Sequence, residues 1–186
     1  MRIRSRSDGT VWMRSEAEIR INYLVYRYNY TSSGTEVWKN GRLLGMQNVS
    51  DYNGTQFQVK AAATAKSLEV TVDGTASKVP PDAWLSSYWQ SPEHIAQTET
   101  ADRDVNGVRP LSIIDSDQGR LIHGKLVRIG DETLNVCGEQ KACSHYRITG
   151  DVTIDVWYDA TGRMVQQESL ERRHKVRFEL TELAAE

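Results

Sequence analysis

The chain has 186 residues, of which 39% are hydrophobic and 26% charged, and its formal net charge is −2. This length is that of one ordinary domain with its own hydrophobic core. The near-neutral charge, without a basic stripe interleaved with aromatic residues, argues against a nucleic-acid-binding protein. No apolar run reaches the roughly 18 residues needed to cross a bilayer, so we expect a chain that does not span a membrane.

The first long extended run reaches from Thr10 to Tyr30. Apolar and polar residues alternate along it, but the apolar set changes parity between Tyr23 and Leu24. A strand cannot switch faces without an irregularity, so we predict a bend or β-bulge at this point. Such a bend would help a sheet to curl.

Three hairpin signals follow within forty residues, at Asn40-Gly41, Asn53-Gly54 and Asp73-Gly74. A type I′ turn needs a positive φ at both of its central residues, and these pairs tolerate that conformation. With extended runs from Gln56 to Ala62 and from Ser67 to Val72 between them, the turns predict an antiparallel meander.

The segment 79–96 breaks the β pattern, because its prolines bar a central strand. Asp82 is suited to cap a short helix, and a second helix is expected to start near Ser91-Pro92. This helical plug would carry three large rings, those of Trp84, Tyr88 and Trp89. We predict that these three residues bind a ligand together with two tryptophans from elsewhere in the chain, Trp38 and Trp157. The rings on the plug suit either the wall of an apolar pocket or a closed core.

Short strands resume after the plug, with turns at Gly130-Asp131 and Asp159–Gly162. The charged run from Glu168 to Lys175 suits a surface turn or short helix. Many short strands at this spacing are typical of a barrel or strongly curled sheet. We therefore predict a mainly β fold: one domain over residues 1–186, built as a curled antiparallel meander or incomplete barrel with one short helical plug.

The two cysteines, Cys137 and Cys143, flank a polar, glycine-containing stretch that suits a loop. We predict a disulfide between them, which would contribute roughly 2–2.5 kcal/mol in the chain-entropy model and indicate an oxidising compartment. Two free thiols near a hairpin end are the alternative. A metal site is not expected, because the spacing is not that of a CxxC pair and no second pair exists.

Four residues are candidates for acid–base chemistry, in two pairs across predicted turns: Asp115 with His123, and His145 with Asp151. A hydrogen-bonded structural role is the alternative for each. The chain contains no Gly-x-Ser-x-Gly, phosphate loop, dinucleotide fingerprint or His-Glu-x-x-His. We therefore predict no cofactor and leave catalysis open.

Motifs at three places carry a resemblance: Glu36–Leu43, Ser87-Tyr88-Trp89, and Tyr146–Asp151 followed by Asp155–Gly162. Together they resemble an uncharacterised family of exported bacterial proteins, classed as a domain of unknown function. A looser likeness extends to lipoprotein carriers of the envelope, which wrap a curled sheet around a helix. The resemblance implies a curled antiparallel sheet in the periplasm or outside the cell, and it brings no catalytic residues.

An exported location implies that this chain is a mature form, because the basic Met1–Arg6 leads into no apolar signal region. Our first functional hypothesis is an envelope protein that holds a lipid or another apolar small molecule in its curled sheet. The second is a cofactor-independent isomerase, cyclase or hydrolase that uses the same cavity with a His/Asp or Tyr/Asp pair. A protein-binding module is the third, and the oligomeric state stays open.

Overall fold

The computed structural model describes residues 1–24, 26–92, 108–171 and 174–182. Within these ranges the chain forms fourteen β-strands and no helix, which confirms the mainly β prediction. The chain divides into two compact units, residues 1–86 with 114–121 and residues 87–113 with 122–186. Neither unit is one continuous segment, and the prediction of a single domain over residues 1–186 stays a prediction.

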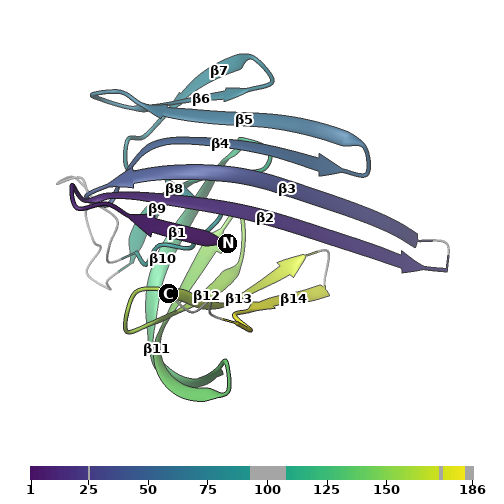
Figure 1. The fold of residues 1–186 in the computed structure, drawn as a ribbon, viewed down its shortest axis with the longest axis vertical. Helices are drawn as coiled ribbons and strands as arrows, with labels where there is room; N and C mark the ends of the chain where they lie inside the picture. Colours follow the sequence, from purple (N-terminus) through teal and green to yellow (C-terminus); the bar gives the residue numbers. More distant parts are fainter. Residues whose placement is uncertain (25, 93–107, 172–173, 183–186) are drawn as a thin grey trace. The chain divides into compact units, whose positions relative to one another are not determined.

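The first sheet is an antiparallel meander whose seven strands follow one another in chain order (Figure 1). Asn40, Asn53 and Asp73 have φ values of 50°, 54° and 47°, and a glycine of positive φ follows each, so the three predicted hairpin turns are confirmed. The strands are β1 (Arg2–Ser5), β2 (Thr10–Tyr23), β3 (Tyr26–Lys39), β4 (Arg42–Tyr52), β5 (Thr55–Ala63), β6 (Leu68–Val72) and β7 (Thr75–Val79).

The bend predicted near Tyr23–Leu24 is a chain reversal instead. Strand β2 ends at Tyr23, β3 begins at Tyr26, and these two residues pair across an antiparallel ladder. Leu24 takes up a φ of 50°, which leucine rarely adopts, so the sequence carries no ordinary turn signal here. The change of parity reflects a turn between two strands rather than a bulge within one.

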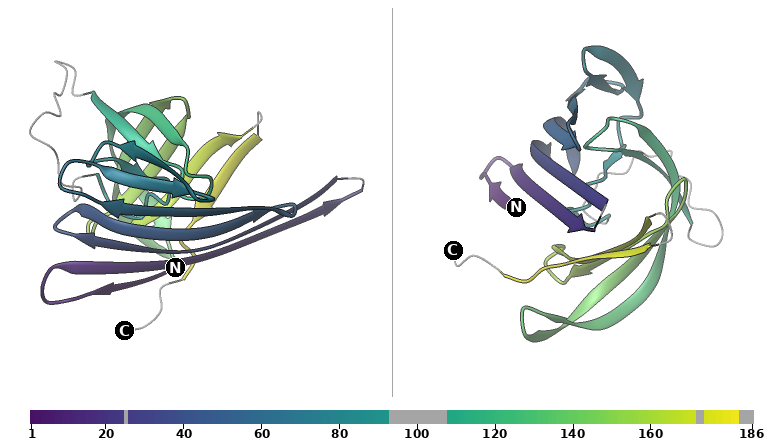
Figure 2. Two further views of the ribbon diagram at one scale, coloured as in Figure 1. Left: turned by 90° about the horizontal axis from the view of Figure 1, so that it is seen from above. Right: turned by 90° about the vertical axis from the view of Figure 1, so that its right-hand side faces the viewer.

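The second sheet has the order β14-β13-β12-β11-β10-β9-β8, again an antiparallel meander. It curls into a half-barrel, and Figure 2 shows β10 and β11 bending along their length. Strand β10 runs through Gly130 with a register shift between Arg128 and Gly130, so the turn predicted at Gly130-Asp131 is wrong and a bulge takes its place. The strands are β8 (Trp84–Leu85), β9 (Arg109–Ile114), β10 (Leu121–Val136), β11 (Glu139–Gly150), β12 (Ile154–Asp159), β13 (Met164–Glu171) and β14 (His174–Glu179).

The predicted helical plug is wrong as far as the structure describes that segment. Residues 80–92 form turns and the two-residue strand β8, and no helix. Ala83, Trp84 and Leu85 are all buried, whereas a short amphipathic helix would leave one side of such a run exposed. Tyr88, with a φ of 47°, is incompatible with a continuing helix. The second predicted helix falls largely on residues 93–96, outside the described ranges.

The predicted disulfide is also wrong, since both cysteines are free thiols. The pairing of Val136 with Glu139 makes Cys137 and Gly138 a tight two-residue hairpin turn rather than a loop. Cys143 lies four residues further along β11, which at ~3.3 Å per residue places it roughly 13 Å from the turn. A disulfide needs Cα atoms within about 7 Å. The structural basis for an oxidising compartment is therefore absent.

Candidate functional site

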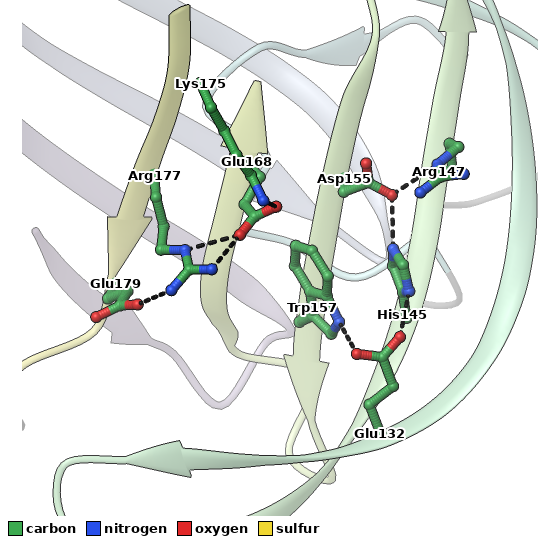
Figure 3. Close-up of polar contacts among 9 residues, drawn as sticks. All are labelled: Glu132, His145, Arg147, Asp155, Trp157, Glu168, Lys175, Arg177 and Glu179. Carbon is green, nitrogen blue, oxygen red and sulfur yellow. Dashed lines mark hydrogen bonds and ion pairs between the residues drawn. The ribbon is translucent and has the colours of Figure 1, made fainter. Parts of the chain in front are cut away.

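The two faces of β11 and β12 differ sharply in chemistry. In the middle of β11 and along β12 the even-numbered side chains are buried and mostly apolar: Tyr146, Ile148, Ile154, Val156 and Tyr158 are at 8% exposure or less. Since successive side chains of a strand point to opposite faces, the odd-numbered ones share the other face. Ionisable groups gather on that face, joined by neighbours from three more strands (Figure 3).

His145 stands at the centre of this polar face, between two carboxylates. Its Nδ1 lies 2.7 Å from Glu132 Oε1 and its Nε2 lies 2.6 Å from Asp155 Oδ1. The register places Trp157 directly opposite His145, and their rings stack with centroids 4.2 Å apart and planes 17° apart. The histidine is only 5% exposed. Both ring nitrogens are therefore engaged by carboxylate oxygens.

Both carboxylates have a second donor. Trp157 Nε1 donates to Glu132 Oε2 at 3.1 Å, and Arg147 Nε donates to Asp155 Oδ1 at 2.8 Å. Glu132 is thus held at both of its oxygens, yet its side chain stays 45% exposed. Its orientation is fixed while its remaining lone pairs face solvent, which is the state of a preorganised acceptor.

A second ionic group lies on β13 and β14, where Glu168 pairs with Arg177 across the ladder. Lys175 Nζ lies 2.6 Å from Glu168 Oε2, and Arg177 donates to Glu168 Oε1 at 2.7 Å and to Glu179 Oε1 at 3.1 Å. Burial alone would raise the pKa of Glu168, but the hydrogen bonds from Lys175 and Arg177 outweigh it, so that the pKa lies below the ordinary value of 4.5. The charged run predicted as a surface turn or short helix forms cross-strand ion pairs.

We expect Glu168→Gln to lower the free energy of unfolding by about 1 kcal/mol at pH 7, since its two cationic partners are themselves half exposed. A folded-state pKa below 4.5 means that this contribution is fully present above pH 4.5 and is lost as the pH falls through the lower, folded value. The gap between wild type and variant should therefore shrink in acid, as measured by urea unfolding at pH 7 and pH 3. Glu69→Gln, at an exposed position of β6, is the control and should leave the free energy of unfolding nearly unchanged. An equal gap between wild type and Glu168→Gln at both pH values contradicts the prediction.

An open groove of about 770 Å³ runs along this face. That volume lies within the range of small-molecule sites. The groove is walled by Glu132 and Trp157 on one side and by the Glu168–Arg177 group on the other, and its lining residues are Glu132, Leu134, Asn135, Cys137, Gly138, Trp157, Gln166, Glu168, Arg177, Glu179, Leu180 and Thr181. The lining comes from β10, β12, β13 and β14 and the segments that adjoin them.

The predicted catalytic pairs are arranged differently from the expectation. His145 bonds to Glu132 and Asp155, while Asp151 accepts a hydrogen bond from the backbone N–H of His123 at 2.8 Å. His123 itself is exposed. Asp115 accepts from Arg120 and from the backbone of its own loop. Of the four candidates, His145 alone belongs to the polar face beside the groove.

The predicted ligand-binding aromatic residues are mostly interior. Trp38, Trp84, Tyr88 and Trp89 are buried, at 7% exposure or less, and they do not line the groove. The indole N–H of Trp38 donates to the buried carboxylate of Glu36 at 2.8 Å. The remaining member of the set, Trp157, is buried as well, at 5% exposure, but it lies in the groove lining.

A separate polar cluster in the first unit surrounds Asp117, in the loop after β9. One carboxylate oxygen accepts from Tyr30 Oη at 2.6 Å and Tyr52 Oη at 3.0 Å, and the other accepts from Ser32 Oγ and Asn48 Nδ2, both at 2.8 Å. Burial, together with the carboxylate, raises the pKa of both tyrosines above the ordinary value. This Tyr–Asp arrangement is saturated with hydrogen bonds and suits an anchor for the loop rather than a site of proton transfer.

The two cysteines differ in their surroundings. Burial raises the pKa of the Cys143 thiol, which keeps it in the unreactive protonated form. Cys137 is exposed at the rim, where its thiol lies 3.6 Å from the carbonyl oxygen of Leu180. Within the described ranges, no three or more His, Cys, Asp or Glu residues are arranged to hold a metal ion.

Sequence reasoning missed Glu132, Asp155, Glu168 and Arg177. One signal was available: in the alternating segment 152–158, Asp155 and Trp157 share a parity, so one polar and one aromatic residue face the same way. The partners on β10 and β14 depend on the strand order and on the bulge at Gly130, which a single sequence does not specify.

Comparison with known proteins yields one family. A family model described as Domain of unknown function (DUF6134) matches residues 1–181. No curated protein and no solved structure matches the chain. In the described ranges, no helix is long and apolar enough to span a membrane.

Proposed function

We propose a function from the groove itself, because this chain belongs to the family described as Domain of unknown function (DUF6134), whose description assigns no activity. The groove binds a small organic cation, which is an amine or guanidinium compound with an apolar part. The observation that carries this proposal is the carboxylate of Glu132. It stands in the groove wall, is held at both oxygens by His145 and Trp157, and stays half exposed.

The charge of the groove favours a cation. Its lining holds the acidic residues Glu132, Glu168 and Glu179 against one basic residue, Arg177. Arg177 is already shared between Glu168 and Glu179, and Lys175 adds a second cation to Glu168. Glu132 receives no hydrogen bond from lysine or arginine in the part of the chain described, so its attraction for an incoming ammonium is the least compensated.

The remaining lining gives the ligand its second feature. The partly buried Leu134 and Leu180, which pack on the cluster that contains Trp157, supply apolar surface beside the carboxylates, and Asn135 and Gln166 supply amide groups. An apolar body with a cationic end would cover the two leucines while its charge meets Glu132. A purely apolar ligand, such as the lipid expected from the sequence, would take water from the Glu132 carboxylate without giving it a cationic partner.

We expect phenethylamine or agmatine to stabilise the protein in thermal unfolding, and Glu132→Gln to weaken that binding about tenfold, the equivalent of ~1.4 kcal/mol for one lost charge-assisted hydrogen bond. Calorimetric titration measures the affinity. The neutral analogue 2-phenylethanol should bind little to either protein.

Glu69→Gln removes an exposed carboxylate from β6 in the other unit and is the matched control; it should bind as wild type does. Equal affinity of wild type and Glu132→Gln for the amines would refute the role of Glu132. Preference for 2-phenylethanol or a fatty acid over the amines would instead support the apolar ligand.

The enzymatic alternative rests on the same carboxylate. Glu132 is the group that would contact a substrate, as a general base, and His145 would act through it as a positioning residue because the ring is buried. Mass spectrometry of each bound amine after prolonged incubation separates the two: an unchanged ligand supports binding, and a product that disappears with Glu132→Gln supports catalysis. An exported location remains part of the proposal, and fractionation of the source cell tests it.

A further inference from the structure

The hairpin of β2 and β3 continues beyond the rest of its sheet. The ladder between β3 and β4 ends at the pair Tyr30–Tyr52, and β1 pairs only with residues 11–14 of β2. Asn29 is still tied to the sheet through hydrogen bonds with Asn53. Beyond it, residues 21–23 form ladder pairs only with residues 26–28, as a two-stranded ribbon, which Figure 1 shows reaching past β4 and β5. Two strands with no further support are marginally stable in water.

The ribbon has one apolar and one polar face. The register pairs Ile19 with Tyr30 and Ile21 with Tyr28 on one face, and Arg20 with Asn29 and Asn22 with Arg27 on the other. The apolar face is open toward its tip: Ile21 is 42% exposed, Tyr23 71% and Leu24 89%. Exposed apolar residues gathered at the end of a projecting element mark a surface that meets something other than water.

The charge at the tip end of the hairpin indicates the kind of surface. Arg20 and Arg27 lie near the tip against one acid, Glu18, which pairs with Arg20, so this end has a net charge of +1 in a chain whose total is −2. The other arginines of β1 and β2 lie at least ten residues from the tip along the strand, roughly 34 Å away. Basic residues near an anionic bilayer each contribute about 1 kcal/mol to binding.

The size of the apolar face decides between a bilayer and a second copy of the chain. Three residue pairs at ~3.4 Å per residue give a ribbon about 10 Å long and two strands wide. That is well below the roughly 800 Å² per partner of a stable protein interface. Shallow insertion at a bilayer needs only a few apolar side chains, and tyrosine suits it because its hydroxyl stays at the headgroups.

We propose that the tip of the β2–β3 ribbon docks on an anionic lipid surface. Leu24 and Tyr23 enter the interface between headgroups and acyl chains, and Arg20 and Arg27 are attracted to the lipid phosphates. This contact is peripheral and independent of the groove in the other unit.

The test is co-sedimentation of the full chain with vesicles of pure phosphatidylcholine and of phosphatidylcholine with one quarter phosphatidylglycerol. We expect binding to the mixed vesicles only. Raising the salt from about 50 to 500 mM should weaken this binding, because the shorter Debye length screens the attraction between arginine and phosphate. The double variant Tyr23→Ser/Leu24→Ser should bind at least about tenfold more weakly. Arg20→Gln/Arg27→Gln should reduce both the binding and its dependence on salt.

The matched control is Leu44→Ser/Val49→Ser, which removes two residues of β4 that are 43% and 48% exposed in the same sheet, away from the tip. It should bind as wild type does, and all variants should unfold within a few degrees of wild type. Absence of wild-type binding to anionic vesicles, or equal loss in the tip and control variants, would overturn the proposal. A change in oligomeric state with the tip variant and no vesicle binding would assign the tip to self-association.

Discussion

Replacing Asp117 with alanine is expected to lower the free energy of unfolding by about 2–4 kcal/mol. Two tyrosine hydroxyls, a serine hydroxyl and an asparagine amide donate to this one carboxylate. Removing the acceptor leaves these donors without their charged partner at a half-buried site, and a hydrogen bond to a charged group contributes about 1.5–3 kcal/mol before such losses overlap. Two bonds to backbone carbonyls would remain, from Asn48 to Ser116 and from Ser50 to residue 117, so the loop would keep part of its hold on the first sheet.

Urea unfolding of the variants measures this effect. Asp117→Asn keeps one acceptor oxygen and should lose less, and Tyr30→Phe and Tyr52→Phe should each lose about 1 kcal/mol. Tyr23→Phe removes a hydroxyl from an exposed tyrosine of the same strand pair and is the control, with no expected change. A loss below 1 kcal/mol for Asp117→Ala would show that water replaces the carboxylate and that the cluster does not anchor the loop.

Turn chemistry explains how much of the fold the sequence reveals. Asn40, Asn53 and Asp73 each precede a glycine and tolerate a positive φ, so local residue preference and final structure agree at all three hairpins. Leu24 adopts the same conformation against its own preference, and the hairpin there depends on the pairing of β2 with β3 along fourteen residue pairs. The helix predicted around Trp84 is wrong for a related reason. Tertiary burial of consecutive side chains outweighed the local helix-capping preference of Asp82.

The polar face of the second sheet was only partly predictable. Local alternation places Asp155 with Trp157 and His145 with Arg147, because residues two apart in a strand share a face. Nothing local brings Glu132 to the same point. Its approach requires β10 to pair with β11 and the bulge between Arg128 and Gly130 to shift the register by one residue. A glycine that looked like a turn is thus the residue that completes the site.

Because the site depends on how the strands of the second sheet pair, a substitution within it should also change the stability of that sheet. His145→Ala tests this. We expect a loss of about 2–4 kcal/mol in the free energy of unfolding, because removing the buried ring leaves a gap beside Trp157 and takes away a hydrogen-bond partner of both carboxylates. The Glu132 and Asp155 carboxylates would lose the ring between them, and Trp157 would lose its stacking partner. Urea unfolding, monitored by tryptophan fluorescence, measures the loss in the free energy of unfolding.

His123→Ala is the matched control, because that histidine is exposed on β10 and only its backbone N–H is bound by Asp151; its loss should stay within ~0.5 kcal/mol. His145→Gln tests the cause, since an amide can donate to just one of the two carboxylates while filling part of the space, and it should fall between wild type and alanine. If His145→Ala is no worse than His123→Ala, the two carboxylates are stable without the ring. Glu132 is then not held by His145, and its preorganisation for a cationic ligand has lost its main support.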